Sequence, residues 1–419
     1  MSAHSPSPPR SPLHGWIPAL AAVVASLAAM AVVAALGIWA AGAADLPEGA
    51  FGPVLAAVMV LAVGGTVRLE GDAGGLAGTE GGLTVIPLTV TLTGALLLGW
   101  FFLRPLNRRT VVGAPALAGW AARIAVLWLL AVLGLALAAR RTFEVSLGDD
   151  LLGDLGELFG VKPTVGFAAD VLPTVLIGLV WLAGVLVVAI LVSHGAPLPP
   201  ELMRFQAGAR PAARAALGLL LAAVAVALVV ALVVAATKGH TAETFAVILL
   251  GLPNVAWLGL TVGLGATWEG RVEGPFGLPM PQVLDEVLRT PDVSELNLGT
   301  LVDHDGGRWW WLLVGAAVLV VAAACFMAAT SPSRVPPWQH ALRLAVALAL
   351  TVLMIGPTAR ISARIGLSVL GIGDLGEGLT GQVLLEPQLW GALGLALLWG
   401  LVAGFAGAWA VKGLRRRGR

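Results

Sequence analysis

Two short motifs place opposite charges directly after apolar segments. The sequence RLEG at 68–71 follows the segment 51–66, and RVEG at 271–274 follows the segment 244–266. Glycine and proline interrupt both segments, which predicts helices too short or too broken to cross a bilayer. Ionisable groups held at membrane depth usually mark a pathway or an ion pair, and broken helices in repeated halves build the substrate sites of secondary transporters. Arg68, Glu70, Arg271 and Glu273 are therefore candidate pathway residues, or they only mark where each segment leaves the bilayer.

The remaining reactive side chains form no catalytic or metal-binding set. The run 303–305 (DHD) offers two carboxylates and an imidazole, but three adjacent residues rarely converge on one ion. The string GIGDLG at 371–376 fits G-x-G-x-x-G without the strand and soluble helix that a dinucleotide site needs. No Walker A, H-E-x-x-H or G-x-S-x-G motif occurs in the sequence. We therefore expect no metal, no cofactor and no enzyme activity.

The composition requires a membrane. The chain of 419 residues is 58% hydrophobic and 12% charged, so its polar residues are too few to cover an apolar core in water. About eight segments reach the roughly 20 apolar residues that a helical crossing requires. The net charge of +1 provides no basic field for a nucleic acid. The lipid bilayer is the expected partner, while protein partners and oligomeric state stay open.

We predict an all-α, polytopic membrane protein built as two tandem, pseudo-symmetric halves. A disordered tail (1–14) precedes the first half (15–193), which holds four membrane helices and the broken segment 51–66. A cytoplasmic connector (194–212) leads to the second half (213–411), with four helices, the broken segment 244–266 and an outer loop (275–308). A basic tail (412–419) ends the chain. The duplication rests on two matches in the same order, RLEG with RVEG at an offset of 203 and GDLGE at 153–157 with 373–377 at an offset of 220.

The distribution of arginine predicts the orientation. If segments 51–66 and 244–266 are re-entrant, eight crossings place both termini on one side, together with 15 of the 25 basic residues and one of the 24 acidic residues. The positive-inside rule then makes that side cytoplasmic and the protein a component of the cell membrane. If both segments cross fully, the basic residues divide almost evenly, so the re-entrant arrangement is favoured.

Two kinds of loop on the opposite side have alternative interpretations. Residues 283, 284, 287 and 288 fall on one face of a short predicted helix in the loop 275–308, which would act as a lid over a pathway or only cover exposed core. The acidic loops 148–160 and 371–379 would bind a cation or a basic partner, or would only be solvated.

Long strings of the sequence resemble one family of membrane proteins. The string GLPNVAWLGLTVGLGATWEGRVEGPFGLPMPQVLDEVLRTPDVSELNLGTL, with PWQHALRLAVALALTVLMIG, LSVLGIGDLGEGL and PLTVTLTGALLLGWFFLRPL, is similar to the streptophobe family of actinobacteria such as Streptomyces. The resemblance covers nearly the whole chain. It implies a highly hydrophobic multi-pass protein, and because that family has no established activity it implies no catalytic or binding residue.

Two functions compete at this point. A transporter or channel would use the paired broken helices at the interface of the two halves, with Glu70 and Glu273 as candidate ion or substrate groups and Arg68 and Arg271 as their partners. A non-catalytic membrane scaffold would instead use its loops to hold envelope or developmental partners. The sequence leans towards transport, because a scaffold has little use for paired broken helices; an intramembrane enzyme is the least favoured alternative.

Overall fold

The computed structural model describes residues 15–72, 77–107, 113–144, 164–193, 198–239, 241–273, 294–332, 335–369 and 381–417. Several predicted features lie outside these residues. They are the N-terminal tail, the helix expected near residues 283–288, the acidic loops 148–160 and 371–379, and the end of the basic tail.

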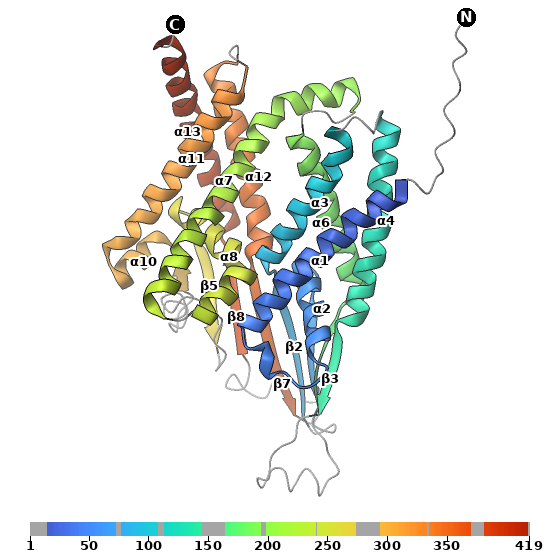
Figure 1. The fold of residues 1–419 in the computed structure, drawn as a ribbon. Helices are drawn as coiled ribbons and strands as arrows, with labels where there is room; N and C mark the ends of the chain where they lie inside the picture. The colour runs from blue at the N-terminus through green and yellow to red at the C-terminus, as the bar shows by residue number, and fades with distance from the viewer. Residues whose placement is uncertain are drawn as a thin grey trace, which may run out of the picture.

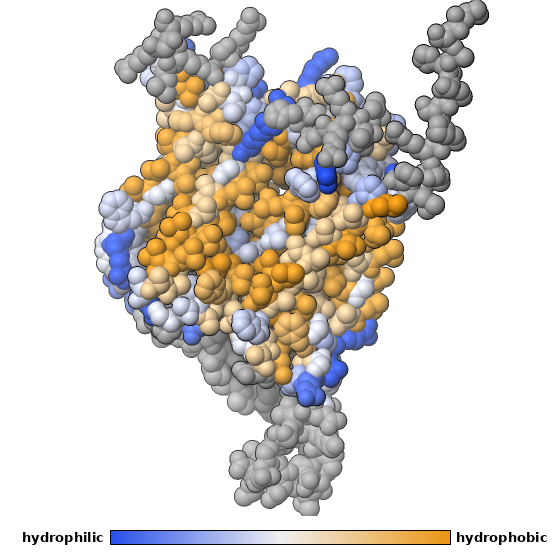
Figure 2. All heavy atoms as spheres, viewed as in Figure 1, coloured by the Kyte–Doolittle hydropathy of each residue, from blue (hydrophilic) through white to orange (hydrophobic). Residues whose placement is uncertain are grey.

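The described residues contain nine helices that are long and apolar enough to cross a membrane. These are α1 (Trp16–Ala40), α3 (Leu88–Asn107), α4 (Ala114–Ala138), α6 (Val171–Val192), α7 (Pro200–Lys238), α8 (Thr241–Gly263), α11 (Trp310–Thr330), α12 (Pro337–Ala359) and α13 (Leu389–Arg417). Large apolar side chains such as Val180 and Trp390 point away from the protein, and Figure 2 shows apolar side chains across the face of the bundle in view. The chain is a multi-pass membrane protein, as the composition predicted.

An eight-stranded antiparallel sheet, which the sequence analysis missed, extends from one end of the bundle (Figure 1). Its strands run in the order β3-β4-β1-β2-β7-β8-β5-β6. The first four are β1 (Val67–Asp72), β2 (Ala77–Val85), β3 (Arg140–Glu144) and β4 (Thr164–Ala169); the last four are β5 (Trp268–Glu273), β6 (Ser294–Leu296), β7 (Ile361–Val369) and β8 (Gly381–Pro387). The beginning of α1 and the end of α13 lie at the opposite end of the bundle. Three shorter elements complete the described structure: η2 (Ala43–Asp45), α10 (Leu298–Asp305) and η3 (Gly307–Trp309).

The two segments predicted to be broken form helices that lead straight into this sheet. Helix α2 (Phe51–Ala62) has 12 residues, too few to cross, and β1 follows it. Helix α8 is continuous over 23 residues and contains Pro253, so the interruption predicted within 244–266 is absent. One proline removes only one backbone hydrogen bond, and half of the apolar window of α8 is buried against other elements, which holds the helix together.

The sheet has one charged face and one apolar face, because directly opposed residues of antiparallel strands point the same way. The charged face carries Arg68, Arg140, Glu269, Arg271 and Glu386, and the apolar face carries Val67, Leu83, Phe167, Val383 and Leu385. Helix α2 covers part of the apolar face and forms a buried cluster with β1 and β4. The sheet is thus attached to the bundle by its apolar side.

Close helix contacts fix the strands that follow. Gly404 of α13 packs on the backbone of Ala341 in α12, since a Cβ at residue 404 would lie 2.5 Å from the Ala341 Cα atom. In the first half the Trp128 indole of α4 donates a 3.1 Å hydrogen bond to the Gly178 carbonyl of α6. Helices α4 and α12 continue into β3 and β7, and β4 and β8 continue into α6 and α13, so these contacts set the strand positions.

One side chain ties the first half of the chain to the second. Asn254 of α8 donates a 2.9 Å hydrogen bond to the Ile86 carbonyl and accepts one of 3.2 Å from the Leu88 backbone N–H, at the junction between β2 and α3. These two backbone groups lack an in-helix partner because Leu88 is the first residue of α3.

Candidate functional site

The structure places the four predicted pathway residues in the sheet. Arg68 and Glu70 belong to β1, and Arg271 and Glu273 belong to β5. Three strands separate β1 from β5, so at roughly 4.8 Å per strand the two pairs stand about 19 Å apart. The fold therefore does not bring the two pairs together. The side chain of Glu273 lies outside the described residues.

Arg68 forms an ion pair with Asp170 rather than with Glu70. The second carboxylate oxygen of Asp170 accepts a 3.0 Å hydrogen bond from the Thr66 hydroxyl. Asp170 directly precedes α6, and its carboxylate is mostly covered, with 22% of the side chain exposed against 61% for Arg68. This contact joins the start of β1 to the start of a membrane helix, which is a structural role.

Backbone hydrogen bonds show that the sequence match between RLEG and RVEG is displaced by two residues. After α2, the Gly65 N–H donates to the Val60 carbonyl; after α8, the Ala266 N–H donates to the Thr261 carbonyl, each at 2.9 Å. These turns correspond at an offset of 201. Arg68 therefore corresponds to Glu269 and Glu70 to Arg271, so the charges are exchanged. A two-residue shift leaves each side chain on the same face of a strand, which is why the short match looked convincing.

The charged faces of the two sets of strands differ at one pair, because the contact between Gln388 and Glu269 has its counterpart in Asp170 and Arg68. Gln388, which directly precedes α13, donates a 2.8 Å hydrogen bond to Glu269. Arg360, directly before β7, forms a 3.2 Å ion pair with Glu386 of β8. At the corresponding place in the first set, Arg140 of β3 stands opposite Ala168 of β4, which has no carboxylate.

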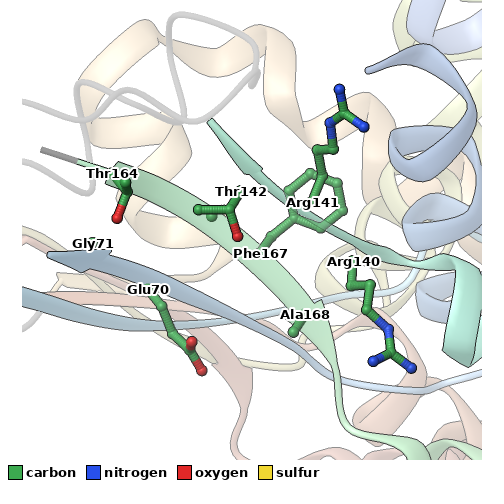
Figure 3. A pocket seen from close by; sticks show the side chains of 9 residues that line it. Glu70, Gly71, Arg140, Arg141, Thr142, Thr164, Phe167 and Ala168 are labelled. Carbon is green, nitrogen blue, oxygen red and sulfur yellow. The ribbon is translucent and has the colours of Figure 1, made fainter. Parts of the chain in front are cut away.

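A hollow of about 570 Å³ lies on the first set of strands, where the small side chains of β4 leave room (Figure 3). Glu70, Arg140 and Thr142 contribute polar groups to it. Gly166 and Ala168 have no side chain or only a methyl group, so they leave the space open. Glu70 and Arg140 point to the same side of the sheet, and Arg141 points to the other side beside the Phe167 ring. The hollow is lined by Glu70, Gly71, Arg140, Arg141, Thr142, Thr164, Gly166, Phe167 and Ala168.

Charge and hydrogen bonding make the hollow suited to binding. Both Glu70 and Arg140 are exposed. Arg140 uses its Nε atom to donate to the Leu137 carbonyl at 2.9 Å, while within the described part of the chain Glu70 makes no ion pair. A molecule with an anionic group and a donor group would match this pair, because a guanidinium binds anions and a carboxylate accepts hydrogen bonds. The described residues contain no cluster of three metal-binding side chains.

Of the other candidate residues from the sequence, some belong to regular structure and the rest lie outside the described residues. Residues 303–305 form the end of the short helix α10. Asn297 and Thr300 form a capping box at its beginning. The sequence did carry a signal for the missed sheet: ISARIGLSV at 361–369 alternates apolar and polar residues, the pattern of a half-buried strand. Arg140 and Ala168 had no signal, because only the pairing of β3 with β4 places them together.

No family model, curated protein or solved structure matches the chain. Membership in the streptophobe family therefore stays a prediction.

Proposed function

We propose that the protein is a non-catalytic, multi-pass membrane scaffold that binds a polar partner on the charged face of its sheet. The observation that supports this is the position of Arg68, Glu70 and Arg271, which stand in strands of one sheet instead of in the break of a membrane helix. A transporter or channel, the function favoured by the sequence, needed these residues at membrane depth.

The ends of α2 and α8 are packed like a protein core, which also favours a scaffold. Ala62 and Val63 at the end of α2 are 0% and 1% exposed, and Leu264 and Ala266 after α8 are 7% and 3% exposed. The Thr91 hydroxyl donates a 2.6 Å hydrogen bond to the Ala62 carbonyl, one of the backbone groups that a helix end leaves without a partner. These four side chains are covered by protein and line no water-filled path.

For the membrane arrangement we propose eight crossings in two tandem halves, with α2 and α8 as re-entrant helices. Helix α8 is long enough to cross, but β5 follows it and lies in the same sheet as the other strands, which returns the chain to the side of the sheet. The strand order β3-β4-β1-β2 is followed by the corresponding order β7-β8-β5-β6, which supports the duplication. Each re-entrant helix is followed by a strand of the sheet, β1 after α2 and β5 after α8. We place the termini in the cytoplasm, the sheet outside the cell membrane, and the protein in the streptophobe family.

Cysteine accessibility distinguishes the scaffold from a transporter. In a Cys325→Ala background, single cysteines at Ala62 and Ala266 test the helix ends, and cysteines at Glu70 and Thr142 test the charged face. Intact cells are treated with a membrane-impermeant thiol reagent. We expect labelling at Glu70 and Thr142 and protection at Ala62 and Ala266. Labelling at both helix ends would show a water-filled path and would favour transport.

A photo-crosslinking experiment tests binding at the hollow. A photoreactive residue at Thr142 should form a protein or small-molecule adduct in native membranes, whereas one at Trp390, 88% exposed on the bundle, should react with lipid. Ala168→Glu should abolish the adduct, because it rebuilds on Arg140 the ion pair that Arg360 and Glu386 form. Ala168→Ser, which keeps the space, is the matched control. An adduct that survives Ala168→Glu would refute the hollow as the binding site.

A further inference from the structure

Two arginines stand inside membrane helices at corresponding positions. Arg123 belongs to α4 and Arg343 to α12, at an offset of 220. The next residue in each helix, Ile124 or Leu344, is completely buried. Both helices continue into strands, β3 and β7, which begin at an offset of 221. The two arginines therefore take the same place in two similar helix–strand units.

Within the described part of the chain, neither arginine has a hydrogen-bond or ion-pair partner, although both are half-buried. Arg68 and Arg360 pair with carboxylates and Arg214 donates to the Val192 carbonyl. A charged group in an apolar span without a partner is costly, and such residues are usually functional. The two guanidinium groups therefore require an acceptor from outside the described part of the chain.

Both side chains extend to the bundle end opposite the sheet. The Cα atom of Arg123 lies about 14 Å along α4 from its first residue, and that of Arg343 about 9 Å along α12, at 1.5 Å per residue. The Arg123 guanidinium lies on the backbone of Gly15 at the start of α1, since a Cβ there would meet its Nη1 atom at 2.6 Å. The Arg343 guanidinium faces Gly208 near the start of α7, at 3.7 Å from such a Cβ. Each glycine leaves space for a charge to reach the membrane surface.

The acceptor available at that depth is the phosphate of a lipid headgroup. Arginine binds phosphate through two parallel hydrogen bonds and buries its alkyl stem in apolar surroundings. Arg204 and Arg210 lie in the first turns of α7, whose start lies at the same end of the bundle (Figure 1). Their positive charge attracts anionic over zwitterionic lipids. We propose that Arg123 and Arg343 form two binding sites for anionic phospholipid, one in each half, in the leaflet on the side of the termini. This proposal does not depend on the scaffold function.

The test measures lipid binding to the purified full-length protein. Native mass spectrometry and thermal unfolding in neutral detergent are followed while phosphatidylglycerol or phosphatidylcholine is added. We expect two tightly bound phosphatidylglycerol molecules and a melting temperature that rises with phosphatidylglycerol more than with phosphatidylcholine. Arg123→Gln and Arg343→Gln should each weaken lipid binding at their own site about tenfold or more, because the charged hydrogen bonds to phosphate are lost, so that one lipid fewer stays bound at the same lipid concentration. The double variant should lose the preference for the anionic lipid.

Matched variants separate a specific site from net charge. Arg104→Gln removes the same charge at the same end, from a side chain that is exposed and stacked on Trp100, and should leave both sites intact. Arg123→Lys should retain most of the lipid binding, which shows that the fold tolerates changes there. Equal lipid preference in the double glutamine variant, or equal loss in Arg104→Gln, would overturn the proposal. Equal protection by inorganic phosphate alone would overturn the lipid as the ligand.

Discussion

Replacing Gly404 of α13 with alanine should destabilise the protein, although alanine is the better helix former. The added Cβ would lie 2.5 Å from the Ala341 Cα atom and 3.1 Å from the His340 carbonyl oxygen, both of which are backbone atoms of α12. Carbon atoms pack at about 3.5–4.0 Å, so the two helices would have to separate by roughly 1 Å. Overpacking of this kind costs about 1–3 kcal/mol.

The intrinsic preference of a helix for alanine acts in the opposite direction. It contributes about 0.5–1 kcal/mol, so the net loss at Gly404 should be about 0.5–2 kcal/mol. Gly394 of the same helix is the matched control, because it is exposed and a Cβ there meets no atom within 4 Å. Gly394→Ala should leave the stability unchanged or raise it slightly.

The assay is thermal or denaturant unfolding of both variants in the same detergent, with helix content checked by circular dichroism. Gly404→Ala should unfold at a lower temperature than wild type and Gly394→Ala at the same or a higher one. If both variants unfold at the same temperature, the close approach of α12 and α13 is wrong. The reason given for the neighbouring positions of β7 and β8 would then be wrong as well.

Three further changes test contacts that position the sheet. Asn254→Ala should cost about 2–4 kcal/mol in the same unfolding assay, because it leaves two backbone groups at the start of α3 without partners; a loss below about 0.5 kcal/mol would contradict the link between the halves. Trp128→Phe should cost about 1 kcal/mol, because the hydrogen bond from the indole N–H to the Gly178 carbonyl is lost. Unchanged stability would show that this hydrogen bond contributes nothing to stability. A double-mutant cycle of Arg68→Ala and Asp170→Ala should give a coupling energy of about 1 kcal/mol or less, since Arg68 is largely exposed; a coupling above about 2 kcal/mol would mean that the ion pair is shielded from solvent.

The apolar runs of the sequence are enough to show that the protein is helical and embedded in a membrane. Runs of apolar residues in α1, α6 and α11 exceed the length of a crossing and carry no charge, so no other environment satisfies their surface. The end of the short helix α2 was also readable from the glycines at 64 and 65, and in the structure Gly64 has φ +86°, a conformation that favours glycine.

The places and partners of the charged motifs follow from strand pairing and could not be predicted from the sequence. Strand pairing depends on residues far apart in the sequence, so a match of four residues could not show that Arg68 corresponds to Glu269 or that its carboxylate partner is Asp170. The strands themselves are short and rich in glycine, as in AGTEGGLTV of β2, and become stable only when neighbouring strands and α2 cover them. The hollow between Glu70 and Arg140 likewise exists because β3 and β4 pair where Ala168 lacks the carboxylate that Glu386 supplies elsewhere in the sheet.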